Sequence, residues 1–305
     1  MTWMTFMPGG NISIRQRQRS GSNTPVGLRL LFIRMKLAFS ELKPDYARYT
    51  YPYVVWAFPE VGETPADFFE RGFLPASPDL SRFYLCRNIR VRLGEFELSS
   101  ENRRILRKGS GILSEVIPRA EFDYTEERRL SWKAYADQRF GEDIMGFARM
   151  DRLMSSPVIS HLLVYREEAT GKELGTALLH LEPDRVAYYY FAFYDLGAFN
   201  RSLGMFMMTS AVQHFANIGY HAIHLGTCYS EKALYKTQFA GVQFCNGAGW
   251  SDNLDELKFL IRREQAPVEK HLFDTPEYLE QFCGGSVAGL EKTASFNLGK
   301  PATKP

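Results

Sequence analysis

Three apolar segments lie close together in the second half of the chain. They cover residues 158–166, 173–181 and 185–195, and short polar stretches containing EATGK and EPD connect them. Short connections with glycine, proline or aspartate are typical of tight turns between antiparallel strands. The pattern therefore predicts a meander of three strands, of which the third is the most aromatic.

A helix is predicted directly after this meander, over residues 201–218. Its apolar residues recur at the spacing of one packed helical face, and Gly219 follows as an end signal. A strand at 220–226, a helix at 230–239 and a strand at 241–247 complete the region. The order β-β-β-α-β-α-β is that of the GNAT acyltransferase fold. The predicted fold class is therefore α+β, GNAT-like, with a mixed and mostly antiparallel central sheet.

The first half of the chain predicts a smaller α+β region. Thr64 and Pro65 have the residue types of a helix start, and residues 82–98 alternate apolar with basic side chains. This alternation predicts a half-buried strand with Arg90 and Arg92 on the face opposite its apolar residues. Two further helices are predicted at 100–108 and 124–140, each preceded by a serine or threonine that can cap it.

Charge and composition divide the chain into four predicted segments. The first 36 residues contain six basic and no acidic side chains and show little periodicity. Such a start suits a transit peptide, a nucleic-acid arm, or sequence upstream of a natural start at Met35. The predicted segments are a basic disordered extension (1–36), an N-terminal α+β region (37–120), a GNAT-like transferase domain (121–265), and a C-terminal helix with a disordered tail (266–305).

Several functional classes are made improbable by composition. The four cysteines are widely spaced and form no C-x-x-C pair, which argues against a zinc knuckle and a disulfide framework. Reduced thiols in a cytoplasmic protein, with no metal, are the resulting expectation. No apolar run reaches the roughly 18 residues of a membrane-spanning helix. Neither a membrane nor DNA is expected as a partner.

The turn between the aromatic strand and helix 201–218 is the first candidate site. A helix N-terminus presents free N–H groups and a positive dipole end, and both favour anions. Arg201 adds a fork suited to phosphate, and Gly204 allows a ligand to approach the backbone closely. In GNAT enzymes the motif R/Q-x-x-G-x-G/A grips coenzyme A here, but Phe206 replaces the last small residue and argues against that ligand. Alternatively, Gly204 only eases strand-to-helix packing and Arg201 is a solvated helix start.

Three stretches in the same order resemble one protein family. FYDLGAFNRSLGMF closely resembles the F-Y-D-P…S-L-G-x-Y/F segment of arginyl-tRNA–protein transferases and their bacterial leucyl-transferring relatives. YHAIHLGTCYSEKALYKTQFAGVQF is similar to their Y-x-Y-L-G-Y…K-M-x-Y-K…F segment, and RVRLGEFELSSENRRILRK to their R-I-x-V-x-x-F-x-x-S-x-x-Q-R-R stretch. In the last two stretches the matching positions are Leu225, Gly226, Lys232, Tyr235, Lys236, Arg90, Phe96, Ser99, Arg103 and Arg104. The similarity runs in patches from about Tyr51 to Trp250.

The sequence also departs from this family. The N-terminal cysteine cluster is missing, only Cys86 of a further cysteine set remains, and Thr227 stands where the family has its second tyrosine. Regulation by a metal, an iron–sulfur cluster or haem is therefore not carried over.

The resemblance implies transfer of arginine or leucine from aminoacyl-tRNA to the N-terminal α-amine of an acceptor protein or peptide. Charged tRNA would be the co-substrate, with no other cofactor. The implied catalytic residues are Asp195, which would orient the amine, and Tyr194, which would line the pocket. The implied tRNA- and donor-binding residues are Arg201, Ser202, Gly204, Lys232, Tyr235, Lys236, Arg90, Arg103 and Arg104.

Structural alternatives exist for these residues. Asp195 could cap a turn, Tyr194 could serve packing, and Lys232 and Lys236, which one helical turn would place on a shared face, could be an ordinary solvated pair. Two other functions also fit the sequence: a non-catalytic relative that binds tRNA or N-terminal peptides, and a GNAT-type acyl-CoA N-acyltransferase. The transferase hypothesis requires a cavity that reaches Asp195.

Overall fold

The computed structural model describes residues 36–289, except 42–44, 46–51, 143 and 198–201. All described residues belong to one compact unit, Ile33–Pro305. The extension predicted at 1–36 lies outside the described residues apart from Lys36, as does the last part of the predicted tail.

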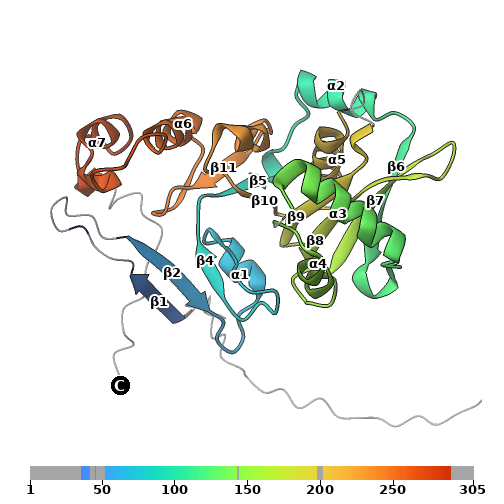
Figure 1. Ribbon diagram of the computed structural model, residues 1–305. Coiled ribbons are helices and arrows are strands. Elements are labelled where there is room, and N and C mark those ends of the chain that lie inside the picture. Colours follow the sequence, from blue (N-terminus) through green and yellow to red (C-terminus); the bar gives the residue numbers. More distant parts are fainter. Residues whose placement is uncertain (1–35, 42–44, 46–51, 143, 198–201, 290–305) are drawn as a thin grey trace, which may run out of the picture. The chain divides into compact units, whose positions relative to one another are not determined.

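An eight-stranded sheet forms the centre of the protein (Figure 1). Its strands, in spatial order, are β12 (Trp250–Ser251), β11 (Val242–Cys245), β5 (Asn88–Arg92), β10 (Ala222–Thr227), β9 (Val186–Tyr194), β8 (Glu173–Glu182), β7 (His161–Glu167) and β6 (Ile112–Pro118). Neighbouring strands are antiparallel throughout, except that β9 and β10 are parallel. The predicted α+β class with a mixed, mostly antiparallel central sheet is confirmed.

A second, smaller sheet precedes the large one in the chain. It has the order β1 (Lys36–Glu41), β2 (Tyr53–Phe58), β4 (Phe83–Leu85) and β3 (Phe73–Pro75), and all its pairs are antiparallel. Helix α1 (Pro65–Phe69) lies between β2 and β3 in sequence and has Thr64 as its N-cap and proline in its first turn, as predicted. Phe69 of α1 packs against Tyr188 of β9, which joins this region to the large sheet.

Helices cover both faces of the large sheet, and alternate residues of its strands point to different cores. Leu163 and Tyr165 of β7 pack with α2 (Ser100–Lys108), α5 (Leu203–Asn217) and α6 (Leu254–Arg263). Leu162 and Val164 of the same strand pack with α3 (Glu126–Phe140) and α4 (Phe147–Met154). In Figure 1, α3 lies across the front of β8 and β9.

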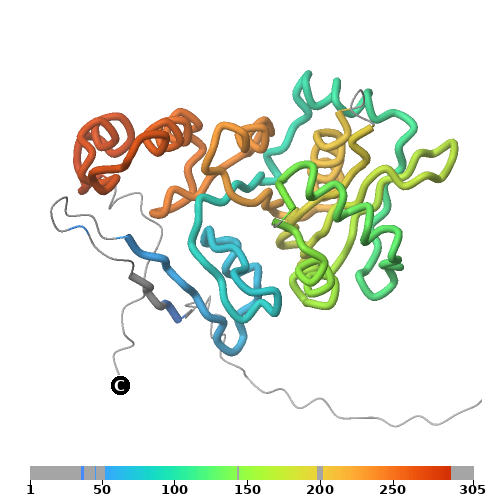
Figure 2. The backbone as a smooth tube through the Cα atoms, viewed as in Figure 1, coloured from blue at the N-terminus to red at the C-terminus, as the bar shows by residue number. Residues whose placement is uncertain are grey.

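The C-terminal helices lie at the other end of the sheet. Figure 2 shows the orange and red part of the chain, with α6 and α7 (Pro276–Phe282), beside β11 and away from the green α3 and α4. Buried Glu256 of α6 holds this end together, because it accepts hydrogen bonds from Asn246 Nδ2 (3.0 Å) and Tyr278 Oη (2.7 Å).

Most of the predicted elements are present. The predicted meander is β7, β8 and β9, and helices α2 and α3 begin after capping residues Ser99 and Thr125 as expected. The segment predicted as a helix at 230–239 is instead a 3₁₀ helix, η4 (Glu231–Thr237). β5 and β6 belong to the large sheet although they lie within the predicted region 37–120, so the sheet is continuous across residue 120.

Candidate functional site

The parallel strands β9 and β10 are paired over only a short length and then diverge. They pair from Ala222 with Val186 to His224 with Tyr188, and no pairing of later residues follows. β9 then continues beside β8 to Tyr194, while β10 continues beside β5 to Thr227. We call this break in the pairing, formed by residues 189–194 and 225–227, the split. Backbone groups of both strands are thus left available at one point in the middle of the sheet.

A β-bulge in β9 lies at the start of the split. Leu178 of β8 pairs with Phe191 and Leu179 pairs with Tyr189, so Tyr190 has no partner opposite it. A bulge changes which face the following side chains point to. Tyr190 and Phe191 accordingly both pack on the α3–α4 side, with Tyr190 also reaching the α1 cluster, whereas Tyr189 packs in the core beneath α5. β9 therefore contributes tyrosines to both faces beside the split.

Tyr194 lies directly on the first turn of α5. A Cβ atom placed on Gly204 would be 2.7 Å from the Tyr194 hydroxyl oxygen and 2.8 Å from the adjoining ring carbon. Glycine is therefore needed at 204 because the tyrosine ring occupies the space of a side chain. The expectation that Gly204 leaves this surface bare for a ligand is wrong, and the packing alternative is observed instead. At Gly204, the group that lies against the first turn of α5 is therefore the Tyr194 hydroxyl.

Other tyrosines surround that hydroxyl. The rings of Tyr135 and Tyr194 have centroids 4.8 Å apart. Burial, and next the neighbouring Tyr194, raise the pKa of Tyr235. Burial and the neighbouring tyrosines, Tyr235 and Tyr194 among them, also hold the pKa of Tyr189 well above its usual range. The structure thus brings together Tyr194 and Gly204, two of the residues expected in the site.

The N-terminus of α5 retains the features of an anion site. Ser202 precedes the helix with left-handed backbone angles (φ 50°, ψ 44°), which are unfavourable for a residue with a side chain. The N–H groups of Met205 and Phe206 donate to the Ser202 carbonyl, while those of Leu203 and Gly204 have no acceptor among the described residues. Lys108 Nζ donates to Ser202 Oγ at 3.3 Å, so a cation from α2 reaches this turn. Arg201, expected to bind phosphate here, lies outside the described residues.

Asp195 caps the turn that follows β9. Its Oδ1 accepts from the Gly197 N–H at 2.8 Å, and its Oδ2 accepts from Lys172 Nζ at 2.9 Å. The Lys172 ammonium, and next the Gly197 N–H, lower the pKa of Asp195. A carboxylate with a lowered pKa is a poor proton acceptor but a stable negative charge. The turn-cap alternative therefore describes its contacts, and an electrostatic role suits it better than proton abstraction.

Lys232 and Lys236 do not share a helical face. Because η4 is a 3₁₀ helix with three residues per turn, positions four apart point in different directions. Lys232 is exposed, whereas Lys236 is partly buried and its Nζ donates to the Thr227 carbonyl at 2.8 Å. Burial lowers the pKa of Lys236. Lys236 thus places its charge at the end of β10, beside the split, and Lys232 faces solvent.

Phe206 is turned away from the helix N-terminus. It is 5% exposed, its ring packs where a Gly109 side chain would lie, and it meets Tyr165 edge-on at 6.0 Å. The ring joins α5 to the end of α2 and does not cover the first turn of α5. Its size therefore gives no argument against coenzyme A, contrary to the expectation from the sequence.

Arg90 is not an exposed side chain. Its Nε and Nη2 donate to Gln243 Oε1 at 3.0 and 2.7 Å, and its guanidinium lies 4.0 Å from the centre of the Trp250 ring. Burial, and next the charge of Arg92, lower the pKa of Arg90 to about 10. The expectation that Arg90 binds tRNA is not supported by this position, because Gln243 of β11 accepts from two of its nitrogens and Trp250 of β12 lies against its guanidinium.

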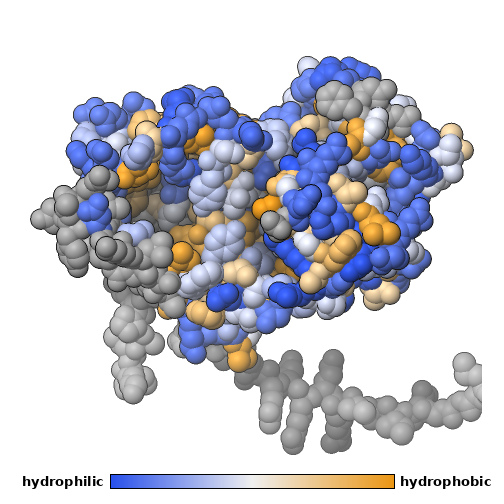
Figure 3. All heavy atoms as spheres, in the orientation of Figure 1, coloured by the Kyte–Doolittle hydropathy of each residue, from blue (hydrophilic) through white to orange (hydrophobic). Residues whose placement is uncertain are grey.

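The arginines of α2 lie on the surface. Arg103, Arg104 and Arg107 are exposed, as is Lys108 at the end of the helix. Arg104 is paired with Glu101 one turn earlier at 2.5 Å, and Arg103 Nη1 donates to the Leu98 carbonyl at 2.6 Å. Figure 3 shows mainly hydrophilic residues over α2, at the upper right of the view. This surface ends at Ser202, so it leads directly to the first turn of α5.

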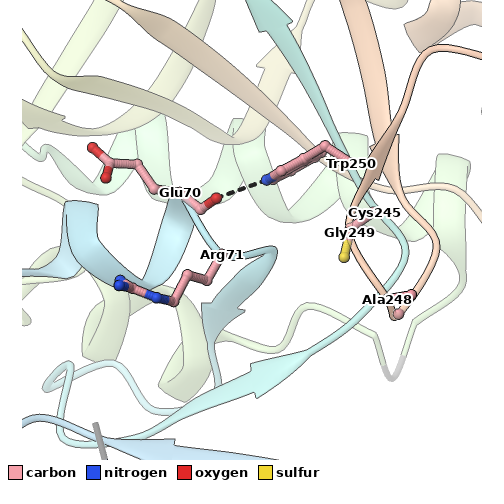
Figure 4. Close-up of a pocket in the computed structure, with 7 residues that line it drawn as sticks. Glu70, Arg71, Cys245, Ala248, Gly249 and Trp250 are labelled. Carbon is pink, nitrogen blue, oxygen red and sulfur yellow. Dashed lines mark hydrogen bonds between the residues drawn. The ribbon is translucent and has the colours of Figure 1, made fainter. Parts of the chain in front are cut away.

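Two cavities lie elsewhere on the described surface. The first, of about 270 Å³, is lined by residues that follow α1 and by the β11–β12 turn. Figure 4 shows its Trp250 pointing toward Glu70, whose carbonyl accepts from the indole N–H at 2.7 Å. The second, of about 280 Å³, is lined by Tyr190, by α4 and by the β3–β4 turn. Neither is lined by Asp195, so the cavity that the transferase hypothesis requires at that carboxylate is not one of these two and stays a prediction.

The sequence did not reveal several partners of the site. Lys172 is 23 residues from Asp195, and Gln243 is 153 residues from Arg90, so neither pairing has a local signal.

Among residues 36–289 that the structure describes, no helix is long and apolar enough to cross a membrane. Within the same residues, no group of three His, Cys, Asp or Glu side chains is placed to hold a metal ion.

Comparison with known proteins gives a consistent but distant relationship. No family model matches the sequence. The aspartate/glutamate leucyltransferase of Methylorubrum populi is 27% identical over 182 residues, which cover 54% of this chain and 71% of that protein. The enzyme of the same name from Nitrobacter hamburgensis is 27% identical over 180 residues, covering 54% and 68%. The resemblance expected from the three motifs is confirmed as distant homology.

Solved structures overlap the chain only in part. The C-terminal domain of a putative lysylphosphatidylglycerol synthetase from Agrobacterium fabrum superimposes with a TM-score of 0.38 and 20% identity, over 61% of this chain and 54% of that one. FemX superimposes with a TM-score of 0.36 and 10% identity, over 64% and 80%. The chain thus spans about half the length of the first of these structures. Superpositions that cover only part of the proteins give no information on the substrate or the mechanism.

Proposed function

We propose that this chain, a distant homologue of the aspartate/glutamate leucyltransferases, is an aminoacyl-tRNA–protein transferase. It moves leucine or arginine from charged tRNA to the α-amine of a cytoplasmic protein whose first residue is acidic. Leucine and an acidic acceptor are favoured by the names of the relatives. The observation that carries the proposal is that residues of two shared motifs lie beside the split: Tyr194 lies against Gly204, and Lys236 donates to the Thr227 carbonyl.

In this proposal α2 and the N-terminus of α5 bind the acceptor end of the tRNA. Phosphates contact the exposed arginines of α2 without regard to sequence. Lys108 continues this surface to Ser202, 3.3 Å away. The N–H groups of Leu203 and Gly204 then offer donors to the last phosphate, at the positive end of the helix dipole. The esterified ribose follows and lies beside Tyr194.

The reaction joins the acceptor nitrogen to the carbonyl carbon of the aminoacyl ester. As the C–N bond forms, the C–O bond to the terminal ribose breaks, and the proton lost by the amine ends on the ribose oxygen. The ester is already activated and an α-amine is partly neutral near pH 7, so positioning of the two reactants supplies most of the acceleration. The Tyr194 hydroxyl donates to the developing charge on oxygen, and the Asp195 carboxylate orients the amine.

Two other functions remain in competition because of specific contacts. Asp195 is held by Lys172 and Gly197, as a purely structural residue would be, which suits a relative that binds without turnover. Phe206 is buried in the core and does not cover the first turn of α5, so its size does not exclude an acyl-coenzyme A. Each of these functions predicts a different result in one assay.

The test incubates the purified full chain with tRNA carrying labelled leucine or arginine and with peptides that begin with Asp, Glu or Ala. Transfer to the free α-amine of the acidic peptides, and none to an N-acetylated peptide, is expected. Tyr194→Phe and Asp195→Asn are each expected to lower the rate on the order of 10²-fold. Binding of peptide and tRNA without transfer would indicate the non-catalytic relative. Transfer from acetyl-coenzyme A, with no response to charged tRNA, would overturn the proposal.

A further inference from the structure

The cavity over Tyr190 lies across β9 from the proposed donor site. Pairing between β9 and β10 ends at Tyr188, and the unpaired bulge residue Tyr190 comes two positions later. Its side chain packs with the clusters on the α1 and α3–α4 side, opposite the α5 side on which Tyr189 packs. A single strand therefore separates this cavity from the point at which the split opens. A ligand there approaches the split from the face that the tRNA does not use.

Two arginines of α4 line this cavity. Arg149 and Arg152 are exposed and stand with Tyr190, Leu153 and Val158 around a space of about 280 Å³. Sites for drug-sized ligands are typically about 300–1,000 Å³, so a group the size of one amino-acid residue fits here. One guanidinium nitrogen of Arg149 donates to the Ile144 carbonyl at 2.8 Å. Within the described part of the chain, no carboxylate pairs with either guanidinium.

The nearby acidic side chains are already engaged. Asp151, on the same helix, accepts from Arg129 at 2.9 Å and from Tyr124 at 3.2 Å. Asp79, in the β3–β4 turn, accepts from the Ser81 hydroxyl at 2.8 Å. The guanidinium groups of Arg149 and Arg152 therefore line the cavity, and neither Asp151 nor Asp79 serves as their anionic partner. Guanidinium groups match the geometry of a carboxylate, which they bind with two parallel hydrogen bonds.

We propose that this cavity binds the side-chain carboxylate of the acceptor's first residue, held by Arg149 and Arg152 against the ring of Tyr190. This inference rests on the proposed function and gives it a specificity site. The acceptor approaches from the α4 face, its acidic side chain stays at the arginines, and its α-amine enters the split. The aminoacyl ester reaches the same point from the α5 face. A first residue with a neutral amide instead of a carboxylate leaves both guanidiniums without a partner, so it is a poorer acceptor.

The experiment compares peptides that begin with Asp or Asn and are otherwise identical. The readout is the ratio of kcat/KM for the two peptides, using charged tRNA as donor. Arg149→Ala and Arg152→Ala are each expected to lower this ratio on the order of 10-fold or more, because each removes a charged hydrogen-bond donor. The value for the Asn peptide is expected to stay nearly constant. Arg166→Ala, which removes a half-buried arginine paired with Glu115 at 2.8 Å, is the control away from the cavity and leaves the ratio unchanged.

Two further measurements separate this inference from the function on which it rests. Arg152→Lys keeps the charge but not the fork and is expected to give an intermediate ratio. Direct binding of the fluorescent Asp peptide is measured in parallel, without tRNA, on variants checked for their folded state by thermal melting. Normal transfer with an unchanged Asp-to-Asn ratio in both alanine variants would overturn the site and leave the function standing. Arginine-dependent peptide binding without transfer would overturn the function and support the site, and absence of both would overturn both.

Discussion

The arginine of β5 and the arginines of α2 come from one basic stretch of sequence but have opposite surroundings. Arg90 donates two hydrogen bonds to Gln243 and lies 4.0 Å from the centre of the Trp250 ring. Arg103, Arg104 and Arg107, a few residues later, lie on the surface of a helix. The first holds three strands of the sheet together, since β5, β11 and β12 all contribute to its contacts. The others are available to a ligand.

The difference shows that a basic residue on a shared motif can serve either the structure of the sheet or the binding of a ligand. A position that matches a family of tRNA-using enzymes can be retained for the integrity of the sheet beside the site. Arg90 and Arg103 were both expected to contact tRNA, and in the proposed function only the exposed arginines of α2 keep this role. Affinity for a polyanion and stability of the fold are therefore separable properties in this stretch, and substitutions can test the separation.

The largest effect on stability is expected from Arg90→Ala. It leaves the Gln243 side-chain oxygen without its donor and removes the contact with Trp250, at a cost of about 2–4 kcal/mol in the free energy of unfolding. Chemical denaturation followed by circular dichroism measures this cost. Arg92→Ala is the control, because the Arg92 side chain is 38% exposed and, among the described residues, forms an ion pair with the exposed Glu95. Equal losses for the two variants would contradict the assigned difference.

A smaller effect is expected from the pH dependence of stability near Arg90. His224 is fully buried, Asn88 Nδ2 donates to its Nδ1 at 2.8 Å, and burial, followed by the charge of Arg90, holds the pKa of His224 well below its usual range. The unfolded chain therefore binds the extra proton first, at its ordinary pKa near 6.5. The stabilisation is present above that pH and is lost as the pH falls below it, by at most about 1.4 kcal/mol per pH unit.

His224→Gln tests this pH dependence. Between pH 7.5 and 5.5 the unmodified protein is expected to lose about 1 kcal/mol more of its free energy of unfolding than the variant does. His221→Gln, at an exposed position of the same region, serves as the control and should behave like the unmodified protein. Parallel curves for all three proteins would show that His224 takes up its proton equally in the folded and unfolded states.

The smallest effect on stability is expected from the arginines of α2. Substituting Arg103, Arg104 and Arg107 together by alanine should change the free energy of unfolding by less than about 0.5 kcal/mol per residue. If these residues contact tRNA phosphates, the plot of log affinity against log salt becomes shallower by roughly 0.7–0.9 for each lost contact. Filter binding over a salt series measures the slope, with Arg262→Ala on α6 as an exposed control. An unchanged slope would remove α2 from the proposed tRNA surface.

The order of strands and helices around the site could be predicted because it depends on local patterns. Apolar periodicity indicated β7, β8, β9 and α5, and capping residues indicated α2 and α3. The type of η4 could not be read in this way, since a short segment with helical residue types forms either an α or a 3₁₀ helix according to its packing. Strands β1, β2 and β6 lacked a clear signal and were not predicted.

The contacts of the site residues were much less predictable. The family motif indicated Tyr194 and Gly204, but not that the tyrosine ring takes the place of a side chain on the glycine. The same motif indicated Asp195, but not its partner Lys172 in the turn between β7 and β8. The arginines of α4 belong to no shared motif, and their position at a cavity follows from the packing of α4 against a bulge in β9. Long-range pairing of this kind depends on the whole fold.

Only three residue pairs join β9 to β10, and they are the seam between two four-stranded halves of the large sheet. Every other adjacent pair around this seam is antiparallel, and most are longer. Few strand-to-strand hydrogen bonds therefore connect the two halves. In our proposal, this sparsely bonded seam is also the place that two macromolecules must enter and leave.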